Sequence, residues 1–331
     1  MPTSLRGTAP RTAAAMTVIA PGLSPTFLTP PPLPLPPKPV PDGEGKGLEG
    51  GELGPGPIDT GKLGPASQRE DVPFIRGGGD GHTVDPNDIN QGGAGSCGLL
   101  ATLHSIAQQD PSAIQDMIQD NGDGTYTVTF HERVEVFGVA TPFWREVQVT
   151  VSGPFAGANP GDVTGNQQEI WPAIIEKAYV QHFHPDFASG STYWPGDKGV
   201  NPGAAMDHLL GPGSSSSGTG DVSSTEMADK LADGEVVVAW TPPFVDDKGN
   251  SLVTKEQQAL IDQYGIYGGH AYAVSEVIPA GTTYVDPNTG QEVVAKEDVV
   301  VLDNPHGRND VVMPYSDYQQ VFGQVSSTAA G

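Results

Sequence analysis

The stretch Gln91-Gly92-Gly93-Ala94-Gly95-Ser96-Cys97-Gly98-Leu99-Leu100 decides how this sequence is interpreted. It places the one cysteine of the 331-residue chain after a glycine-rich approach and at the start of an amphipathic pattern. Apolar residues then recur at the i, i+3, i+4, i+7 spacing of one buried helix face, at Leu99, Leu100, Leu103, Ile106 and Ala107. The pattern predicts a helix over residues 97–109, with the thiol of Cys97 at its N-terminus.

A cysteine in this position has the surroundings that a nucleophile needs. The partial positive charge of a helix N-terminus stabilises a thiolate. Glycines such as Gly95 let a substrate backbone come close to the sulfur. The backbone N–H of Cys97 and a side-chain amide such as Gln91 can bind the oxyanion of a tetrahedral intermediate. Most lone cysteines are small buried core residues, so this motif alone leaves catalysis and packing equally open.

A nucleophilic cysteine also needs a base and a group that orients the base. His270 begins an apolar strand after Gly268 and Gly269, and Asn304 follows the apolar strand 299–302. Adjacent antiparallel strands can bring two such ends within hydrogen-bond reach. Taken singly, a histidine such as His270 is more often a half-buried structural residue, and Asn304-Pro305 is more often the start of a turn. The other histidines, including His104 in the middle of the predicted helix, are interpreted as surface or structural residues.

Four collinear motifs resemble those of calpain-family cysteine peptidases, which have a papain-like fold. Residues 91–100 resemble Gln-Gly-x-x-Gly-Asp-Cys-Trp-Leu-Leu, and residues 170–179 resemble Leu-Trp-Pro-x-Leu-Leu-Glu-Lys-Ala-Tyr. Residues 269–274 match Gly-His-Ala-Tyr-x-Val, and residues 302–307 resemble Leu-Arg-Asn-Pro-Trp-Gly. The similarity covers about residues 87–322.

The resemblance implies a role for each matching residue. Cys97 is the expected nucleophile, His270 the general base, and Asn304 the group that orients the His270 ring. Gln91 is expected in the oxyanion hole. Gly269 and Gly95 are expected to bind the substrate backbone.

The departures from the family motifs include three positions at or beside the expected site. Ser96 stands where the family has an acidic or amide residue, and Gly98 replaces the tryptophan after the cysteine. His306 replaces the tryptophan that shields the histidine–asparagine pair from water. Without that shield, we expect a weaker pair or a change in the substrates that fit.

The predicted fold is α+β and papain-like, in one peptidase domain over residues 86–325. A helical subdomain of about 86–210 carries the cysteine, a β-rich subdomain of about 221–325 carries the histidine and asparagine, and the substrate lies between them. Residues 1–85 hold 16 of the 32 prolines, and such a composition cannot offset the entropy of ordering the backbone, so this segment is predicted to be disordered. Residues 211–220 are predicted to be a loop, and residues 326–331 a tail.

The charge of the chain restricts its partners. Residues 1–85 carry 7 basic and 9 acidic side chains, which leaves 9 basic and 31 acidic ones and a net charge of −22 for residues 86–331. A surface this acidic repels phosphate backbones, so nucleic-acid binding is not expected. No stretch has the ~18 apolar residues of a membrane span. A protein or peptide substrate and a delivery or docking partner for the Pro-rich segment are the expected partners of a monomer. The compartment stays open between the cytoplasm and export.

The expected activity is that of a cysteine endopeptidase that forms a thioester intermediate, calcium-independent or with an unknown trigger. One cysteine excludes an internal disulfide and a cysteine-based zinc site. The turn at 120–124 lacks the glutamate of a calcium loop, and no cofactor or metal site is predicted. Two alternatives remain. The same triad serves an acyltransferase or transglutaminase-like enzyme, and the fold also serves a catalytically degenerate protein-binding module.

Overall fold

The computed structural model describes residues 70–75, 83–92, 95–153, 155, 163–164, 167–184, 200–246, 248–286 and 290–330. These residues lie in one compact unit, Pro39–Gly331. The helices are α1 (Cys97–Gln109), α2 (Pro111–Met117), α3 (Trp171–Phe183), α5 (Pro202–Leu210), α6 (Ser224–Ala232), α7 (Lys255–Tyr264) and α8 (Tyr315–Val321), with the 3-10 turns η3 (Pro86–Asp88) and η4 (Thr219–Asp221). The mixture of helices and sheets confirms the predicted α+β class.

The strands form two larger and two smaller sheets. The strands are β1 (Glu70–Val72), β2 (Ile118–Asp120), β3 (Thr125–Val136), β4 (Val139–Ser152), β5 (Val163–Thr164), β6 (Gln167–Glu169), β7 (Ser215–Gly218), β8 (Glu235–Trp240), β9 (Ala271–Ile278), β10 (Thr283–Val285), β11 (Glu292–Val294), β12 (Val299–Asp303), β13 (Val311–Pro314) and β14 (Gln324–Ala329). The largest sheet has the order β13-β12-β9-β8-β14-β7, and every neighbouring pair in it is antiparallel. Strands β9 and β12 are therefore neighbours, as predicted from their sequences.

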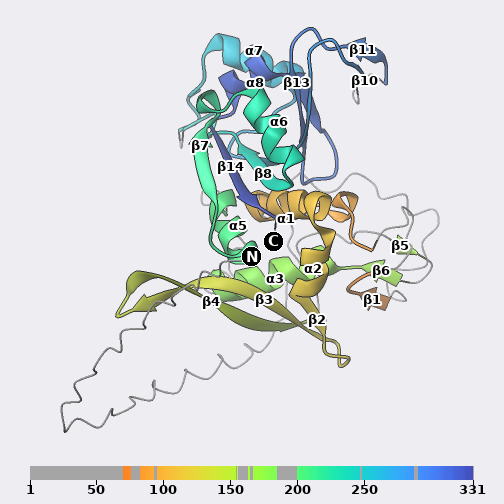
Figure 1. Cartoon of the computed structure of the whole chain (residues 1–331), viewed down its shortest axis with the longest axis vertical. Coiled ribbons are helices and arrows are strands. Elements are labelled where there is room, and N and C mark those ends of the chain that lie inside the picture. The colour runs from red at the N-terminus through yellow and green to blue at the C-terminus, as the bar shows by residue number, and fades with distance from the viewer. Residues whose placement is uncertain are drawn as a thin grey trace, which may run out of the picture. The chain divides into compact units, whose positions relative to one another are not determined.

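Helix α1 is the central element of the fold. It contacts strands β8 and β9 of the large sheet and also helices α3 and α5. Figure 1 shows it in orange, with the blue-green strands above it and α3 below. All its residues from Gly98 to Ala107 are buried. Apolar side chains at helical spacing thus produced the predicted helix with its predicted bounds.

Strand β8 has a buried core on each of its faces. Val236 and Val238 belong to the core around α1, whereas Val237 and Ala239 belong to a second core with α7 and α8 side chains such as Tyr318. Successive side chains of a strand point to opposite faces, which explains this division. It also explains why residues 236–240 form an unbroken apolar run rather than an alternating one.

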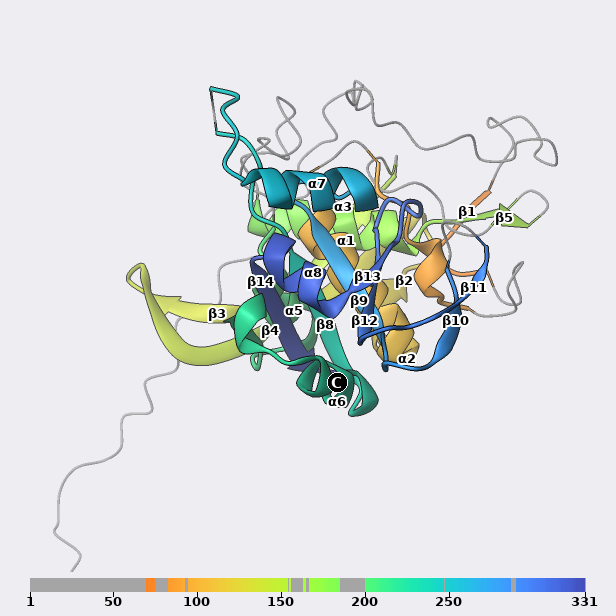
Figure 2. The ribbon, with the colours of Figure 1, turned by 90° about the horizontal axis from the view of Figure 1, so that it is seen from above.

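A second sheet, β2-β3-β4, is built around a long hairpin. Figure 2 shows the β3–β4 hairpin projecting to one side of the elements around α1. At its tip, Phe137 is fully exposed and has a left-handed backbone, with φ of 53°, and Gly138 follows with φ of 75°. The sheet carries α3, which contacts both β3 and β4.

The C-terminal end of the chain corrects two predictions. Residues 326–329, predicted to be part of a tail, belong to β14, which pairs with β8 on one side and β7 on the other. The predicted loop 211–220 contains β7 itself. Both strands are rich in serine, and the hydroxyls of Ser216 and Ser326 lie 2.8 Å apart across the pair. Cross-strand hydroxyl pairs stabilise a sheet without apolar alternation, so the pattern did not reveal these strands.

The N-terminal boundary also differs from the predicted one. Within the segment predicted to be disordered, β1 pairs in parallel with β6, and Ile75 and Val84 are buried. The prediction therefore does not hold for these residues, and the rest of the segment lies outside the described residues. Within the described ranges, no helix is long and apolar enough to cross a membrane.

Candidate active site

Cys97 is the first residue of α1, and its sulfur faces the start of β9. Burial raises the pKa of the Cys97 thiol, while the backbone N–H groups of Ala271, Gly98 and Cys97 itself act in the opposite direction. Because Ala271 directly follows His270, this contact brings the cysteine and the histidine strand together. The preceding Ser96 is buried, and its hydroxyl has no hydrogen-bond partner among the described residues.

Gly98 occupies a position with no room for a side chain. A Cβ atom at this position would lie 1.8 Å from the carbonyl oxygen of Val200 and 2.9 Å from its carbonyl carbon. Real Cβ atoms do not approach backbone atoms so closely. The backbone just before α5 therefore lies directly against the first turn of α1, where the calpain motif has a tryptophan. The backbone at Val200 can take this path only because residue 98 is a glycine.

His270 and Asn304 are joined by a hydrogen bond. His270 Nε2 lies 3.0 Å from Asn304 Oδ1, and the same oxygen accepts the backbone N–H of His306 at 3.1 Å. A backbone N–H can only donate, so the shared asparagine atom has to be the acceptor oxygen. Nε2 of His270 therefore carries the proton, and Nδ1 carries the free lone pair. This is the tautomer in which a histidine can accept a proton from a thiol.

The backbone of His270 is fixed by Thr241, the residue that follows β8. The N–H of His270 donates to Thr241 Oγ1 at 3.1 Å, and the N–H of Thr241 donates to the His270 carbonyl at 3.0 Å. Thr241 is itself fully buried and donates its hydroxyl proton to the carbonyl of Tyr267 at 2.7 Å. Both the N–H and the carbonyl of His270 are thus hydrogen-bonded to Thr241, and its ring is hydrogen-bonded to Asn304.

Three aromatic side chains enclose the His270 ring. His306 lies parallel to it, at 5.3 Å between ring centres and 6° between planes. Tyr267 and Tyr272 meet it edge-on at 5.6 Å and 4.9 Å. His270 is consequently only 7% exposed, and burial lowers the pKa of its imidazole to about 4. The shield expected to be lost with the family's tryptophan is supplied here by an imidazole and two phenols.

Gln91 lies beside the asparagine loop. Its backbone N–H donates to the Pro305 carbonyl at 2.7 Å, and its carbonyl accepts from His306 Nδ1 at 3.2 Å. The residue is 4% exposed. Of the two candidate glycines, Gly269 has φ of 63° and donates its N–H to Pro242, whereas Gly95 lies two residues before the cysteine and is half-buried. The chain thus brings Gln91, His270 and Asn304 into one cluster.

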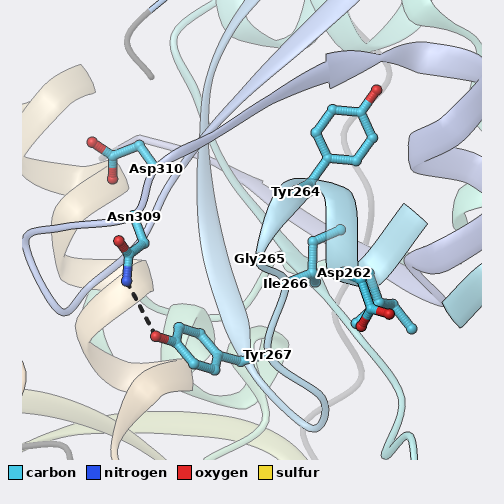
Figure 3. Close-up of a pocket in the computed structure, with 8 residues that line it drawn as sticks. Asp262, Tyr264, Gly265, Ile266, Tyr267, Asn309 and Asp310 are labelled. Carbon is cyan, nitrogen blue, oxygen red and sulfur yellow. Dashed lines mark hydrogen bonds between the residues drawn. The ribbon is translucent and has the colours of Figure 1, made fainter. Parts of the chain in front are cut away.

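A cavity of about 420 Å³ adjoins this cluster through Tyr267 (Figure 3). Asn309 and Tyr267 both line it, and Asn309 Nδ2 donates to the Tyr267 hydroxyl at 3.2 Å. Its lining residues are Ile261, Asp262, Tyr264, Gly265, Ile266, Tyr267, Asn309 and Asp310. Two of them are carboxylates, which favour a cationic group over an anionic one.

A thiol at a helix N-terminus, facing the strand of a buried histidine whose ring is hydrogen-bonded to an asparagine, is the arrangement expected of a cysteine peptidase. Comparison with known proteins adds a match to one peptidase family. Residues 78–194, which include Gln91 and Cys97, match the calpain family cysteine protease. The chain carries a calpain-like cysteine peptidase core.

Individual relatives agree with the family match. The chain is 28% identical over 229 residues to calpain-13 of Rattus norvegicus, and 24% identical over 265 residues to calpain-5 of Mus musculus. It is 26% identical over 202 residues to the calpain-type cysteine protease DEK1 of Zea mays. These alignments cover 67%, 74% and 59% of this chain, but 29%, 38% and 8% of the relatives. The chain thus spans well under half the length of each.

Several residues of the candidate site had no recognisable signal in the sequence. The contacts of Thr241 with His270 join positions 29 residues apart. Tyr267 lies three residues before His270, but only the fold brings its ring against the imidazole. His104 was interpreted as a surface or structural residue. It is buried, and its Nε2 lies 3.1 Å from Asp303 Oδ2, next to Asn304. A histidine on the apolar face of the nucleophile helix was the available signal.

Proposed function

We propose that this chain is a cysteine endopeptidase with Cys97 as nucleophile, His270 as general base and Asn304 as the orienting residue. The arrangement is papain-like: α1 carries the nucleophile, the strand ends carry the base, and the peptide lies between them. The observation that carries this proposal is the His270–Asn304 hydrogen bond, because it leaves Nδ1 of a buried imidazole free to accept a proton.

The proposed reaction begins from a neutral pair. Burial raises the pKa of the Cys97 thiol and lowers the pKa of His270 to about 4, so thiol and imidazole are both uncharged at neutral pH. As the sulfur attacks the peptide carbonyl, its proton passes to Nδ1 of His270. The N–H of Cys97 and the Gln91 amide stabilise the oxyanion.

The rest of the reaction has two stages. In the first, the imidazolium gives its proton to the leaving amine, the C–N bond breaks, and a thioester to Cys97 remains. In the second, water loses a proton to His270 and attacks the thioester. The C–S bond of the resulting intermediate then breaks, the sulfur takes the proton back from His270, and the acid product leaves. Asn304 keeps the ring in the required tautomer throughout.

The cavity beside Tyr267 gives this proposal a substrate preference. Asp262 and Asp310 are among the residues that line a space of about 420 Å³, and residues 86–331 carry a net charge of −22. We therefore expect peptides with a lysine or arginine near the cleaved bond to be preferred. A peptide library read out by mass spectrometry measures this preference.

Calcium is tested separately. Among the described residues, no group of three or more His, Cys, Asp or Glu side chains is placed to hold a metal ion. The proposed mechanism uses the chain's own side chains, and in its calcium-independent form rates with added calcium and with a chelator are expected to agree. A rate that rises steeply with calcium would contradict the calcium-independent form of the proposal.

The decisive experiment is alkylation of Cys97 by iodoacetamide as a function of pH. The chain has one cysteine, so total alkylation reports on this residue directly. Wild type is expected to react well below pH 8, because neutral His270 accepts the thiol proton. His270→Ala should react more slowly than an ordinary thiol of pKa ~8.5, because the pKa of the buried thiol is raised and no base is left to accept its proton. His131→Ala, a histidine on the hairpin, is the control.

The outcomes separate the proposal from its alternatives. Coincident profiles for wild type and His270→Ala would contradict a working pair and favour a degenerate binding module. If the pair works but an added amine, rather than water, receives the acyl group, the chain is an acyltransferase. Hydrolysis in the presence of the amine supports the peptidase.

A further inference from the structure

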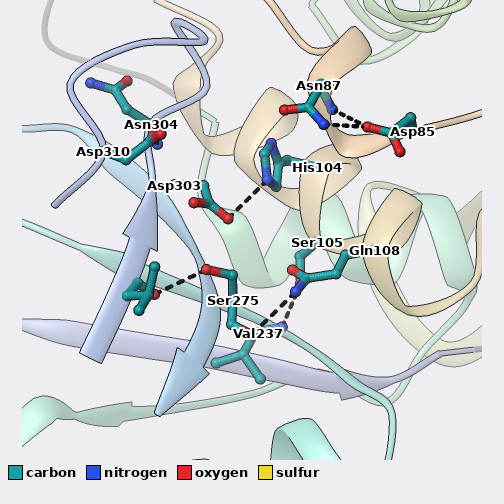
Figure 4. Close-up of polar contacts among 11 residues, drawn as sticks. Asp85, Asn87, His104, Ser105, Gln108, Val237, Ser275, Asp303, Asn304 and Asp310 are labelled. Atoms are coloured by element: carbon teal, nitrogen blue, oxygen red, sulfur yellow. Dashed lines mark hydrogen bonds and ion pairs between the residues drawn. The ribbon is translucent and has the colours of Figure 1, made fainter. Parts of the chain in front are cut away.

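Helix α1 has polar contacts with the large sheet in addition to its apolar packing. Ser105 Oγ accepts the backbone N–H of Val237 in β8 at 2.9 Å. Gln108 Nε2 donates to the carbonyl of Ser275 in β9 at 3.1 Å. Figure 4 shows these contacts along one side of the helix. They attach α1 to two strands, but neither contact lies next to a candidate catalytic residue.

A third contact, between His104 and Asp303, differs in its position. His104 Nε2 lies 3.1 Å from Asp303 Oδ2, at the end of β12 (Figure 4). The side chains are 10% and 22% exposed. A carboxylate oxygen accepts, so the imidazole Nε2–H donates. Asp303 immediately precedes Asn304, whose backbone N–H donates to Asp310 at 2.9 Å. The contact therefore fixes the chain just before the asparagine.

The pair completes a closed path through the site. Cys97 and His104 are on the same helix, about 10 Å apart at 1.5 Å per residue. The Cys97 sulfur faces the N–H of Ala271, and the His104 imidazole binds Asp303. The path then returns through Asn304 to His270. Because α1 is held at two points, both its distance from the ends of β9 and β12 and its angle to them are fixed.

The resemblance to calpains does not account for this pair. The family motif Leu-Arg-Asn-Pro-Trp-Gly has arginine at the position of Asp303. An arginine there would present a cation to the imidazole instead of an acceptor. The two residues also line a cavity of about 400 Å³, together with polar residues that include Gln108 and Asp310. The pair is thus a feature of this chain.

We propose that His104 is a positioning residue: through Asp303 it fixes the asparagine and histidine strand ends relative to the helix that begins at Cys97. This inference rests on the proposed function. Removing the contact lets the strand ends shift against α1, and the His270 ring then meets the thiol at a poorer angle. A displacement of about 1 Å can slow a reaction that depends on alignment by up to about 100-fold.

The experiment compares His104→Leu with Gln108→Leu. Both remove one polar contact between α1 and the sheet, but only the first lies beside Asn304. The readouts are kcat and KM for a peptide that wild type cleaves, the Cys97 alkylation rate at pH 7, and the urea midpoint. We expect His104→Leu to lower kcat about tenfold with KM within about twofold, and to slow alkylation equally. Gln108→Leu should leave kcat within about twofold, whatever its effect on stability.

A rescue and a double-mutant cycle sharpen the comparison. In His104→Gln, a side-chain N–H again faces Asp303, so most of kcat should return. Asp303→Asn should resemble His104→Leu, and the double variant should be no slower than either single one. If His104→Leu fails to fold, Asp303→Asn, which keeps the side-chain shape, takes its place against Gln108→Leu.

The possible failures are distinguishable. Equal kcat losses in the two leucine variants, or simply additive losses in the cycle, would overturn the positioning role while wild type stays active. If wild type and His270→Ala alkylate identically, the proposed function fails instead. That result is obtained without any His104 variant.

Discussion

The two sides of the candidate site are held in place by different means. On the nucleophile side, Cys97 begins a buried helix, and the Val200 backbone lies directly against Gly98. On the base side, neighbouring antiparallel strands bring His270 and Asn304 together, and a hydrogen bond joins the His270 ring to the Asn304 side-chain amide. Close packing thus defines one side, and strand register with polar contacts defines the other. Substitutions should therefore damage stability on the first side and chemistry on the second.

The largest effect is expected at Gly98. Gly98→Ala places a Cβ against the Val200 carbonyl, and backbone atoms cannot move away as a flexible side chain can. We expect a loss of about 3 kcal/mol or more in the free energy of unfolding, measured by urea denaturation. Gly220→Ala is the matched control, because nothing lies within 4 Å of its added Cβ. Equal stability of the two variants would show that the backbone at Val200 can move away from residue 98.

On the base side, Asn304→Ala removes the oxygen that binds both His270 and His306. We expect kcat/KM to fall about 100-fold, because the imidazole loses its defined tautomer and orientation. Asn121→Ala removes an exposed amide in the turn between β2 and β3 and should stay within about threefold of wild type. A similar loss in both variants would mean that the loss is not caused by the missing hydrogen bond to His270.

The burial of His270 should appear as pH-dependent stability. Its pKa is about 4 in the folded chain and 6.5 ordinarily, so the unfolded chain binds this proton first as pH falls. The stabilising effect of neutral His270 is present above pH 6.5 and is lost progressively towards pH 4. Between pH 7 and pH 5, we expect its share of the unfolding free energy to decrease by about 2 kcal/mol. Urea denaturation of wild type and of His270→Gln at several pH values isolates this contribution. If the unfolding free energies of the two proteins change in parallel with pH, the lowered pKa of His270 is refuted.

The smallest effect is expected on the hairpin, away from both sides. Phe137 is fully exposed and left-handed, a conformation that side chains with a Cβ adopt at a cost. Phe137→Gly should stabilise the fold by about 0.5–1 kcal/mol in urea denaturation, with kcat unchanged. Phe143→Gly, nearby in β4 and also exposed, should bring no such gain. A stability loss at Phe137 would mean that its ring has a packing role.

The sequence predicted the catalytic elements well for identifiable reasons. The apolar spacing after Cys97 fixed the bounds of α1, and the apolar runs before Asn304 and after His270 located β12 and β9. The helix and the two strands are largely buried, so their sequences are rich in apolar residues at the spacing of a helix or in unbroken runs. Whether Cys97, His270 and Asn304 act as proposed stays a prediction for the alkylation experiment.

Other parts were missed because their signals were weak or were overlooked. Serine-rich β7 and β14 pair through hydroxyls and backbone, which no hydrophobic pattern records. Helix α7 carried readable signals, since Thr254 and Gln257 form a capping box and Gly265 ends the helix with φ of 64°. The contacts of Thr241 and His104 join strands and helices more than 25 residues apart. A linear pattern contains no information about such pairs.

Strand β8 has a consequence for how the molecule can move. Its alternate side chains belong to two different cores, so neither core can melt without disturbing the other. The cooperative unit of unfolding therefore includes both the nucleophile helix and the histidine strand, and amide protons of Val236 to Ala239 should exchange with solvent only when the whole unit opens. A substrate cannot be admitted by partial unfolding of one side, so any adjustment to it has to come from the loops and side chains at the strand ends.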